Sequence, residues 1–114
     1  MSSDLHGLLL VDKESGISSH DLVAKVRKII GTREVGHSGT LDPMASGLMV
    51  LLIGQATKLS QYILESKKSY RVGLCLGVQT NTLDMTGEVT HTSDLRVEPA
   101  QVFAQAQELQ GDFN

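Results

Sequence analysis

The sequence predicts a mixed-sheet fold, of the α/β or α+β layer type, in one domain. Stretches with strand character alternate along the chain with stretches of helical periodicity, in the order strand, helix, strand, helix, strand, strand, helix. The chain has 114 residues, 40% of them hydrophobic, so it is long enough to bury a core. Only 4% of the residues are aromatic. The core is therefore expected to consist mainly of aliphatic side chains.

The first two predicted elements are a strand and a helix. Residues 8–11 (LLLV) have strand character, and the turn formers at 12–16 end that strand. Ser18 followed three residues later by Asp21 resembles a capping box, which predicts that a helix begins there and that Gly31 ends it as a C-cap. The apolar residues predicted to face the core at helical spacing are Leu22, Val23, Val26, Ile29 and Ile30.

The next elements are a loop and a second strand. Residues 36–47 contain three glycines and one proline, which neither a helix nor a strand accommodates well, so this segment is predicted to be a shaped loop. The apolar run LMVLLI at 48–53 follows and predicts a buried strand. Loops anchored on rigid elements commonly carry functional groups.

The last elements alternate helix and strand. A helical pattern opens at Gly54, with Ala56, Leu59, Ile63 and Leu64 directed toward the core. Alternation at 70–76 predicts a strand whose buried face carries Tyr70, Val72, Leu74 and Leu76. The polar segment 77–87 is rich in turn formers, and residues 88–91 are expected to pair back as a short strand. A final helix starts at Pro99, places Val102, Ala106 and Leu109 on one stripe, and stops at Gly111.

Charge is unevenly distributed along the chain. The formal net charge is -3, but residues 1–71 hold nine Lys or Arg against seven Asp or Glu, whereas residues 72–114 hold only Arg96 against six acids. The first part is thus able to present a basic surface to phosphates, although a solvated helix face is the more common explanation for any one of these charges. Its cations are Lys13, Lys25, Arg27, Lys28, Arg33, Lys58, Lys67, Lys68 and Arg71.

Composition also bears on cellular location. The single cysteine, Cys75, excludes an intramolecular disulfide. The N-terminus lacks the basic start of a signal peptide, and no apolar run is long enough to cross a bilayer. The sequence therefore predicts a soluble cytoplasmic protein with no membrane partner.

Asp42 is the leading candidate for chemistry. It lies in the glycine-rich loop five residues after His37, and no nucleophile elbow or Ser/His/Asp set competes with it. The alternative is that its carboxylate caps the turn that follows, and the residues alone leave these two roles even. The four histidines show no paired spacing, so no metal site is expected. The segment 13–19 is either a helix cap or a phosphate contact at a strand-to-helix junction.

The wider pattern closely resembles the signature of the TruB family of tRNA pseudouridine synthases. The resemblance covers nearly the whole chain. Its central motif is GHSGTLDP at 36–43, followed by ASG at 45–47 and GQATK at 54–58. The other matching segments are GLLLVDK at 7–13, GISS at 16–19, KSYRV at 68–72 and LGVQTNTLD at 76–84 with Gly87.

This resemblance implies an isomerase that converts a T-loop uridine of tRNA to pseudouridine without cofactor or metal. By position Asp42 is implied to be the catalytic nucleophile, acting on the sugar or the base of a nucleotide flipped out of the RNA. Tyr70 matches the family tyrosine that packs on the base and assists proton movement. His37 matches a histidine near the displaced loop, and Lys13 a residue that holds the Asp42 loop or the RNA backbone. The RNA-binding residues implied are His37, Lys13, Gly39, Thr40 and Arg71.

The resemblance also has departures. Glu14 replaces the family's usual proline, and Asn81 its usual aspartate. The family's catalytic domain, an α+β fold with a largely antiparallel sheet, continues beyond Asn114 with the arginine that pairs with the catalytic aspartate. We therefore expect residues 1–114 to be the N-terminal portion of such a domain and to be inactive alone. The alternative function is a non-catalytic fragment that binds RNA or self-associates through exposed sheet edges.

Overall fold

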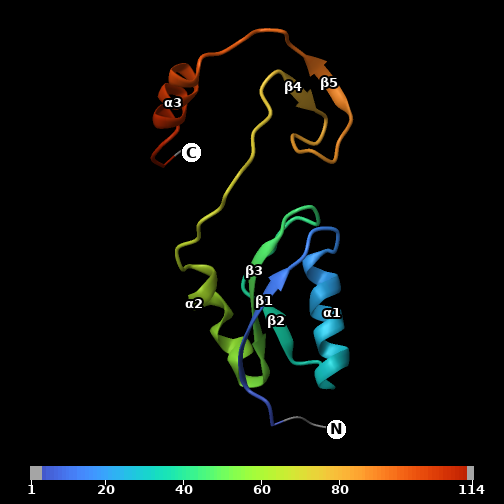
Figure 1. Cartoon of the computed structure of the whole chain (residues 1–114). Coiled ribbons are helices and arrows are strands. Elements are labelled where there is room, and N and C mark those ends of the chain that lie inside the picture. The colour runs from blue at the N-terminus through green and yellow to red at the C-terminus, as the bar shows by residue number, and fades with distance from the viewer. Residues whose placement is uncertain (1–3, 113–114) are drawn as a thin grey trace. The chain divides into compact units, whose positions relative to one another are not determined.

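The computed structural model describes residues 4–112 and divides the chain into two compact units, Met1–Tyr70 (unit 1) and Arg71–Asn114 (unit 2). Figure 1 shows the elements of each unit. Within residues 4–112, three α-helices and two antiparallel sheets confirm the mixed α+β fold. The expectation of one domain stays a prediction, and each unit is described by itself below.

Unit 1 is built on a three-stranded antiparallel sheet in the order β1-β3-β2. The central strand β3 (Gly47–Ile53) pairs along its full length with β1 (Gly7–Lys13), and with the short β2 (Val35–His37) on its other side. Strands were predicted at 8–11 and 48–53, and both are confirmed. The loop predicted at 36–47 begins two residues later than predicted, because Gly36 and His37 pair with β3. Composition alone does not reveal that β3 is available as a hydrogen-bonding partner.

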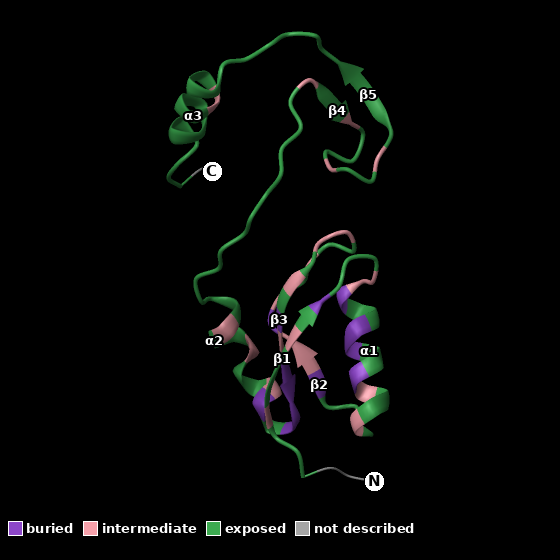
Figure 2. Cartoon of the chain, viewed as in Figure 1, coloured by how far each residue is buried: buried purple, intermediate pink, exposed green. Residues whose placement is uncertain are grey.

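Helix α1 (Ser19–Ile30) begins and ends as predicted. The Ser18 hydroxyl accepts a hydrogen bond from the Asp21 N–H at 3.0 Å, and Gly31 closes the helix with a left-handed φ of 74°. Ile29, however, is 75% exposed, so its predicted core position is wrong. It lies at the edge of the apolar stripe, whose centre faces the sheet. Figure 2 shows buried residues on α1 and β3. The core cluster is Leu22, Val23, Val26, Val35, Met49, Leu51 and Ile53.

The segment after β3 is helical, as predicted, but it is divided into two short helices. It forms a 3₁₀-helix, η1 (Gly54–Leu59), and a five-residue α-helix, α2 (Ser60–Leu64). Of the four positions predicted to face the core, Ala56 is buried and Ile63 partly buried, whereas Leu59 and Leu64 are about half exposed, at 48% and 53%. Two short helices of different pitch cannot present one continuous apolar stripe.

Gly54 occupies a position that only glycine fits. Its φ is +62°, and a Cβ added there would collide with the imidazole of His6 and with the carbonyl of Leu5. The same imidazole accepts a hydrogen bond from the Gln55 N–H at 2.9 Å. The segment before β1 therefore packs directly on the start of η1.

Unit 2 contains a hairpin and a helix. Strands β4 (Val78–Thr80) and β5 (Val89–Thr92) pair antiparallel with an irregularity at Gln79/Thr80, which confirms that residues 88–91 pair back. Helix α3 (Pro99–Glu108) starts at Pro99 as predicted, behind a capping box of Glu98 and Gln101. It ends before Gly111, and of the predicted stripe Val102, Ala106 and Leu109 only Val102 is partly buried.

The strand predicted at 70–76 is absent from the structure, so this prediction is wrong. Its apolar positions Tyr70, Val72, Leu74 and Leu76 are 53–79% exposed. A strand needs a neighbour for its hydrogen bonds, and no strand within residues 4–112 pairs with this segment. Within those residues no helix is long and apolar enough to cross a membrane.

Candidate active site

Asp42 lies in the loop at 38–46 that joins β2 to β3. The loop turns at Asp42, whose backbone carbonyl accepts a hydrogen bond from the Ala45 N–H at 2.9 Å. The Asp42 side chain is exposed, and no described residue donates a hydrogen bond to its carboxylate. The backbone alone closes this turn. The carboxylate is therefore not used as a turn cap and remains open to a ligand.

The residue before Asp42 is fixed by the start of α1. The buried Ser19 hydroxyl donates to the Leu41 carbonyl at 2.9 Å and accepts from the Leu41 N–H at 2.8 Å. Both backbone polar groups of Leu41 are thereby satisfied by one side chain. The Leu41 side chain also packs against the core cluster. Asp42 thus follows a residue that is anchored in unit 1.

The residues after Asp42 are held by the turn that precedes α1. The Gly16 N–H donates to the Pro43 carbonyl at 2.7 Å, and the Ser15 hydroxyl donates to the Met44 carbonyl at 2.8 Å. Residues 13–19 therefore hydrogen-bond to the backbone of the Asp42 loop both before and after Asp42. Glu14, which replaces the family's usual proline, does not prevent this arrangement.

Lys13 provides the most buried of these contacts. Its side chain is only 1% exposed, and its ammonium donates to the carbonyls of Glu14 at 2.9 Å, Ile17 at 2.8 Å and Pro43 at 3.2 Å. An ammonium has three N–H donors, so all are used. Of the two roles considered for Lys13, holding the Asp42 loop is the one that this geometry fits.

His37, Gly39 and Thr40 lie between β2 and Asp42. His37 is half-buried, and its Nδ1 accepts a hydrogen bond from the Gly39 N–H at 3.3 Å, which leaves its Nε2 free to carry the ring proton. Gly39 has a φ of +136°, which favours glycine. Thr40 is exposed. The structure therefore gathers Lys13, His37, Gly39, Thr40 and Asp42 into one region of unit 1.

Tyr70 and Arg71 stand at the boundary between the units. Tyr70 is the last residue of unit 1 and is 66% exposed, whereas Arg71 is exposed and belongs to unit 2. Among the described residues no hydrogen bond joins the Tyr70 side chain to the Asp42 loop. Their roles at the site remain predictions.

Two residues at the site were given no role from the sequence, although Ser19 ends the GISS segment and Lys68 begins the KSYRV segment. Ser19 follows an ordinary helix cap, so its bonds to Leu41 across 22 positions were not predicted. Lys68 is one of many basic residues, yet its ammonium lies beside Gly39. A methyl group added at Gly39 would be 3.1 Å from Lys68 Nζ and 3.7 Å from Leu64 Cδ1.

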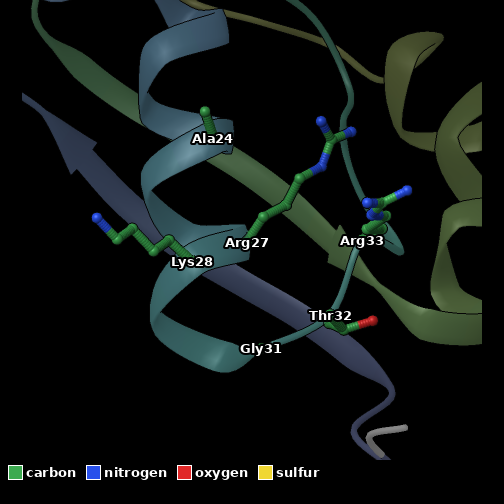
Figure 3. A pocket seen from close by; sticks show the side chains of 6 residues that line it. All are labelled: Ala24, Arg27, Lys28, Gly31, Thr32 and Arg33. Carbon is green, nitrogen blue, oxygen red and sulfur yellow. The ribbon is translucent and has the colours of Figure 1, made fainter. Parts of the chain in front are cut away.

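A basic hollow lies elsewhere in unit 1, at the C-terminal end of α1 (Figure 3). The Arg27 guanidinium donates to the Val35 carbonyl at 2.9 Å and so joins α1 to β2. In Figure 3 the side chains of Arg27 and Arg33 extend to the same side, and Lys28 points away from them. The lining residues are Ala24, Arg27, Lys28, Gly31, Thr32 and Arg33.

Unit 2 contributes a turn built on polar side chains. Asn81 accepts a hydrogen bond from the Glu88 N–H at 2.9 Å through its side-chain oxygen. The Asp84 carboxylate accepts hydrogen bonds from the Thr86 hydroxyl, from the Thr82 hydroxyl and from the Thr86 N–H, and these bonds lower the pKa of its carboxyl below the ordinary value. Within residues 4–112 no group of three or more His, Cys, Asp or Glu is arranged to hold a metal ion.

Comparison with known proteins bears directly on this loop. Residues 27–114 match the model of a family described as TruB family pseudouridylate synthase (N terminal domain). This range includes Asp42, His37 and Tyr70. It begins after the 13–19 segment that grips the loop.

Individual relatives extend the similarity over most of the chain. The tRNA pseudouridine synthase B of Bdellovibrio bacteriovorus is 55% identical over 112 residues, which are 97% of this chain and 36% of that protein. The protein of the same name from Caldicellulosiruptor saccharolyticus is 47% identical over 108 residues, 95% of this chain and 37% of that protein. The protein of the same name from Rhodococcus jostii is 48% identical over 108 residues, which are 94% of this chain and 35% of that protein. The chain spans about a third of the length of these relatives.

Proposed function

The chain belongs to the TruB family of pseudouridylate synthases, whose N-terminal domain it matches, and from this premise we propose that the protein isomerises a T-loop uridine of tRNA to pseudouridine. In this reaction the bond between ribose C1′ and uracil N1 breaks and a bond between C1′ and C5 forms. The proton on C5 is lost and N1 gains one. The product is therefore an isomer of the substrate, and no redox partner is required.

The observation that carries the proposal is the exposed Asp42 carboxylate on a loop held from both sides. Covalent catalysis requires a nucleophile that no internal hydrogen bond occupies and that is held in place before substrate arrives. The bonds from Ser19 to Leu41 and from Lys13 to Pro43 hold the backbone on either side of Asp42. We assign Asp42 as the nucleophile, which bonds covalently to the sugar or the base of the uridine while the detached uracil rotates.

The remaining residues of the site receive roles suited to a flipped base. A uridine in a folded T-loop has to leave its stack before Asp42 reaches it. We assign Tyr70 to this base, because it offers an aromatic face for stacking and a hydroxyl for proton transfer. We assign His37, the last residue of β2, to the space that the base leaves. Thr40, Gly39 and Arg71 are assigned to contacts with the RNA.

The test uses the longer protein that contains this chain, incubated with a tRNA transcript whose nucleosides are then quantified by mass spectrometry. We expect one pseudouridine per transcript, in the T-loop. A matched transcript with cytidine at that uridine is the control and should gain none. Pseudouridine appearing elsewhere in the transcript, or none at all with the uridine transcript, would contradict the proposal.

A second function is favoured by the exposed edge of β1. This seven-residue strand borders the sheet, and its Leu8 and Leu10 are 52% and 64% exposed. Unpaired edges of this kind pair with other chains. For residues 1–114 by themselves we propose self-association without turnover. Light scattering that shows a monomer at all concentrations, or pseudouridine formation by this polypeptide, would contradict it.

A further inference from the structure

We propose that Lys68 binds a phosphate group of the RNA beside the Asp42 loop. The inference rests on the proposed function, because it takes the ligand of this loop to be a polynucleotide. In the sequence Lys68 begins the KSYRV segment, but that match assigns it no contact of its own. What distinguishes it from the other basic residues is its position next to Gly39.

The geometry brings the Lys68 ammonium to the loop that carries Asp42. A methyl group at Gly39 would lie 3.1 Å from Lys68 Nζ, which is closer than ordinary van der Waals contact. Glycine at this position therefore lets the ammonium lie close to the loop backbone. Leu64, at the end of α2, approaches the same point, with its Cδ1 3.7 Å from a Cβ placed at Gly39.

Lys68 is free to take a ligand. Its residue is exposed, and among the described residues its ammonium has neither a hydrogen bond nor a carboxylate within ion-pair distance. Lys13, the other cation at this loop, differs in both respects, because it is buried and donates all three of its hydrogens to backbone carbonyls. Lys68 is thus the cation of this pair that can meet an incoming anion.

The local charge explains why a phosphate needs this contact. The Asp42 carboxylate repels the phosphates that flank a flipped nucleotide. An ammonium beside Gly39, three residues before Asp42, offsets that repulsion where the nucleotide enters. Lysine supplies a compact, hydrated charge on a flexible stem, which suits a phosphate contact that carries no sequence information.

The experiment compares Lys68→Gln with Lys67→Gln in the longer protein. Both variants remove one positive charge from adjacent exposed positions, but only Lys68 has an atom within 4 Å of a Cβ placed at Gly39. tRNA affinity is measured at several salt concentrations, together with single-turnover pseudouridine formation at saturating protein. Circular dichroism melting checks that both variants are folded.

We expect Lys68→Gln to weaken tRNA affinity about tenfold at low salt and to reduce the slope of log affinity against log salt by about one. Lys67→Gln should change affinity less than about twofold. If the two variants behave alike, the proposal is wrong. It is also wrong if Lys68→Gln slows turnover at saturation while affinity and salt slope stay unchanged, since that indicates a role in holding the loop. If wild-type protein makes no pseudouridine yet the salt slope depends on Lys68, the proposed function fails and the phosphate contact stands.

Discussion

Among the residues described, all nine buried apolar side chains lie between Leu22 and Ala56 in unit 1, whereas no residue of 71–112 in unit 2 is buried. In unit 1 a capped helix packs on a sheet, and the Asp42 loop is anchored to that core through Leu41. The hairpin of unit 2 relies on main-chain pairing and on the polar turn around Asn81 and Asp84. A two-stranded hairpin is marginally stable in water. The candidate nucleophile thus lies in the unit that has a core.

This difference explains why a small loop can present a free carboxylate. The Leu41 N–H, a donor beside Asp42, is satisfied by the Ser19 hydroxyl and so does not need the Asp42 carboxylate. The carbonyls of Pro43 and Met44 accept from Lys13 and Ser15, so the loop is held without that carboxylate. Unit 2 uses its aspartate in the opposite way. The Asp84 carboxylate accepts hydrogen bonds from Thr82 and Thr86 within its own turn.

The largest expected effect comes from removing a core side chain. Leu51 is fully buried at the centre of β3, so Leu51→Ala should lower the free energy of unfolding by about 2–5 kcal/mol. Leu74→Ala, at a position 77% exposed in unit 2, should change it by less than about 0.5 kcal/mol. Urea unfolding of the 114-residue chain measures both. Equal losses would show that the two units do not differ in packing.

The next effect concerns the buried lysine. Lys13→Met preserves most of the volume but leaves the carbonyls of Glu14 and Ile17 without this donor, so we expect a loss of about 1–3 kcal/mol in unfolding free energy. Hydrogen exchange at the Gly16 and Ala45 amides should accelerate with it. Lys25→Met, at an exposed position of α1, is the control. Unchanged exchange at both amides would mean that Lys13 does not hold the loop.

A smaller effect is expected at the helix cap. Ser18→Ala removes the acceptor of the Asp21 N–H and should cost about 1 kcal/mol in thermal or urea unfolding. Ser18→Asn keeps an acceptor at the same position and should recover most of the loss. An alanine variant as stable as wild type would indicate that solvent replaces this cap without cost.

The smallest effect is a pH dependence confined to unit 2. The Thr86 and Thr82 bonds lower the pKa of the folded Asp84 carboxyl, so its contribution to hairpin stability is present above the unfolded value and is lost as pH falls through the folded value. NMR titration should show weaker β4–β5 pairing below about pH 4. In Asp84→Asn this pH dependence should disappear. Its persistence would assign the titration to another group.

The features of the fold that depend on neighbouring residues were predicted correctly from the sequence. The cap at Ser18, the glycine at 31, the strands around Leu51 and the helix start at Pro99 all follow from short-range patterns. The contacts of Ser19 and Lys68 were not predicted, because both join residues far apart in the sequence. The prediction of a strand at 70–76 was wrong, because alternating apolar residues indicate which face is buried but do not provide a neighbouring strand to pair with. The exposed position of Ile29 likewise depends on where the sheet lies beneath α1.

Asp42→Asn in the longer protein tests the central claim most directly. The substitution keeps the size of the side chain and removes its nucleophilic charge, while the loop bonds of Leu41 and Pro43 do not involve it. Single-turnover assays at saturating protein should show pseudouridine formation slowed by about a thousandfold or more, with tRNA affinity within about threefold of wild type. Turnover near the wild-type rate would contradict the assignment of Asp42 as the nucleophile.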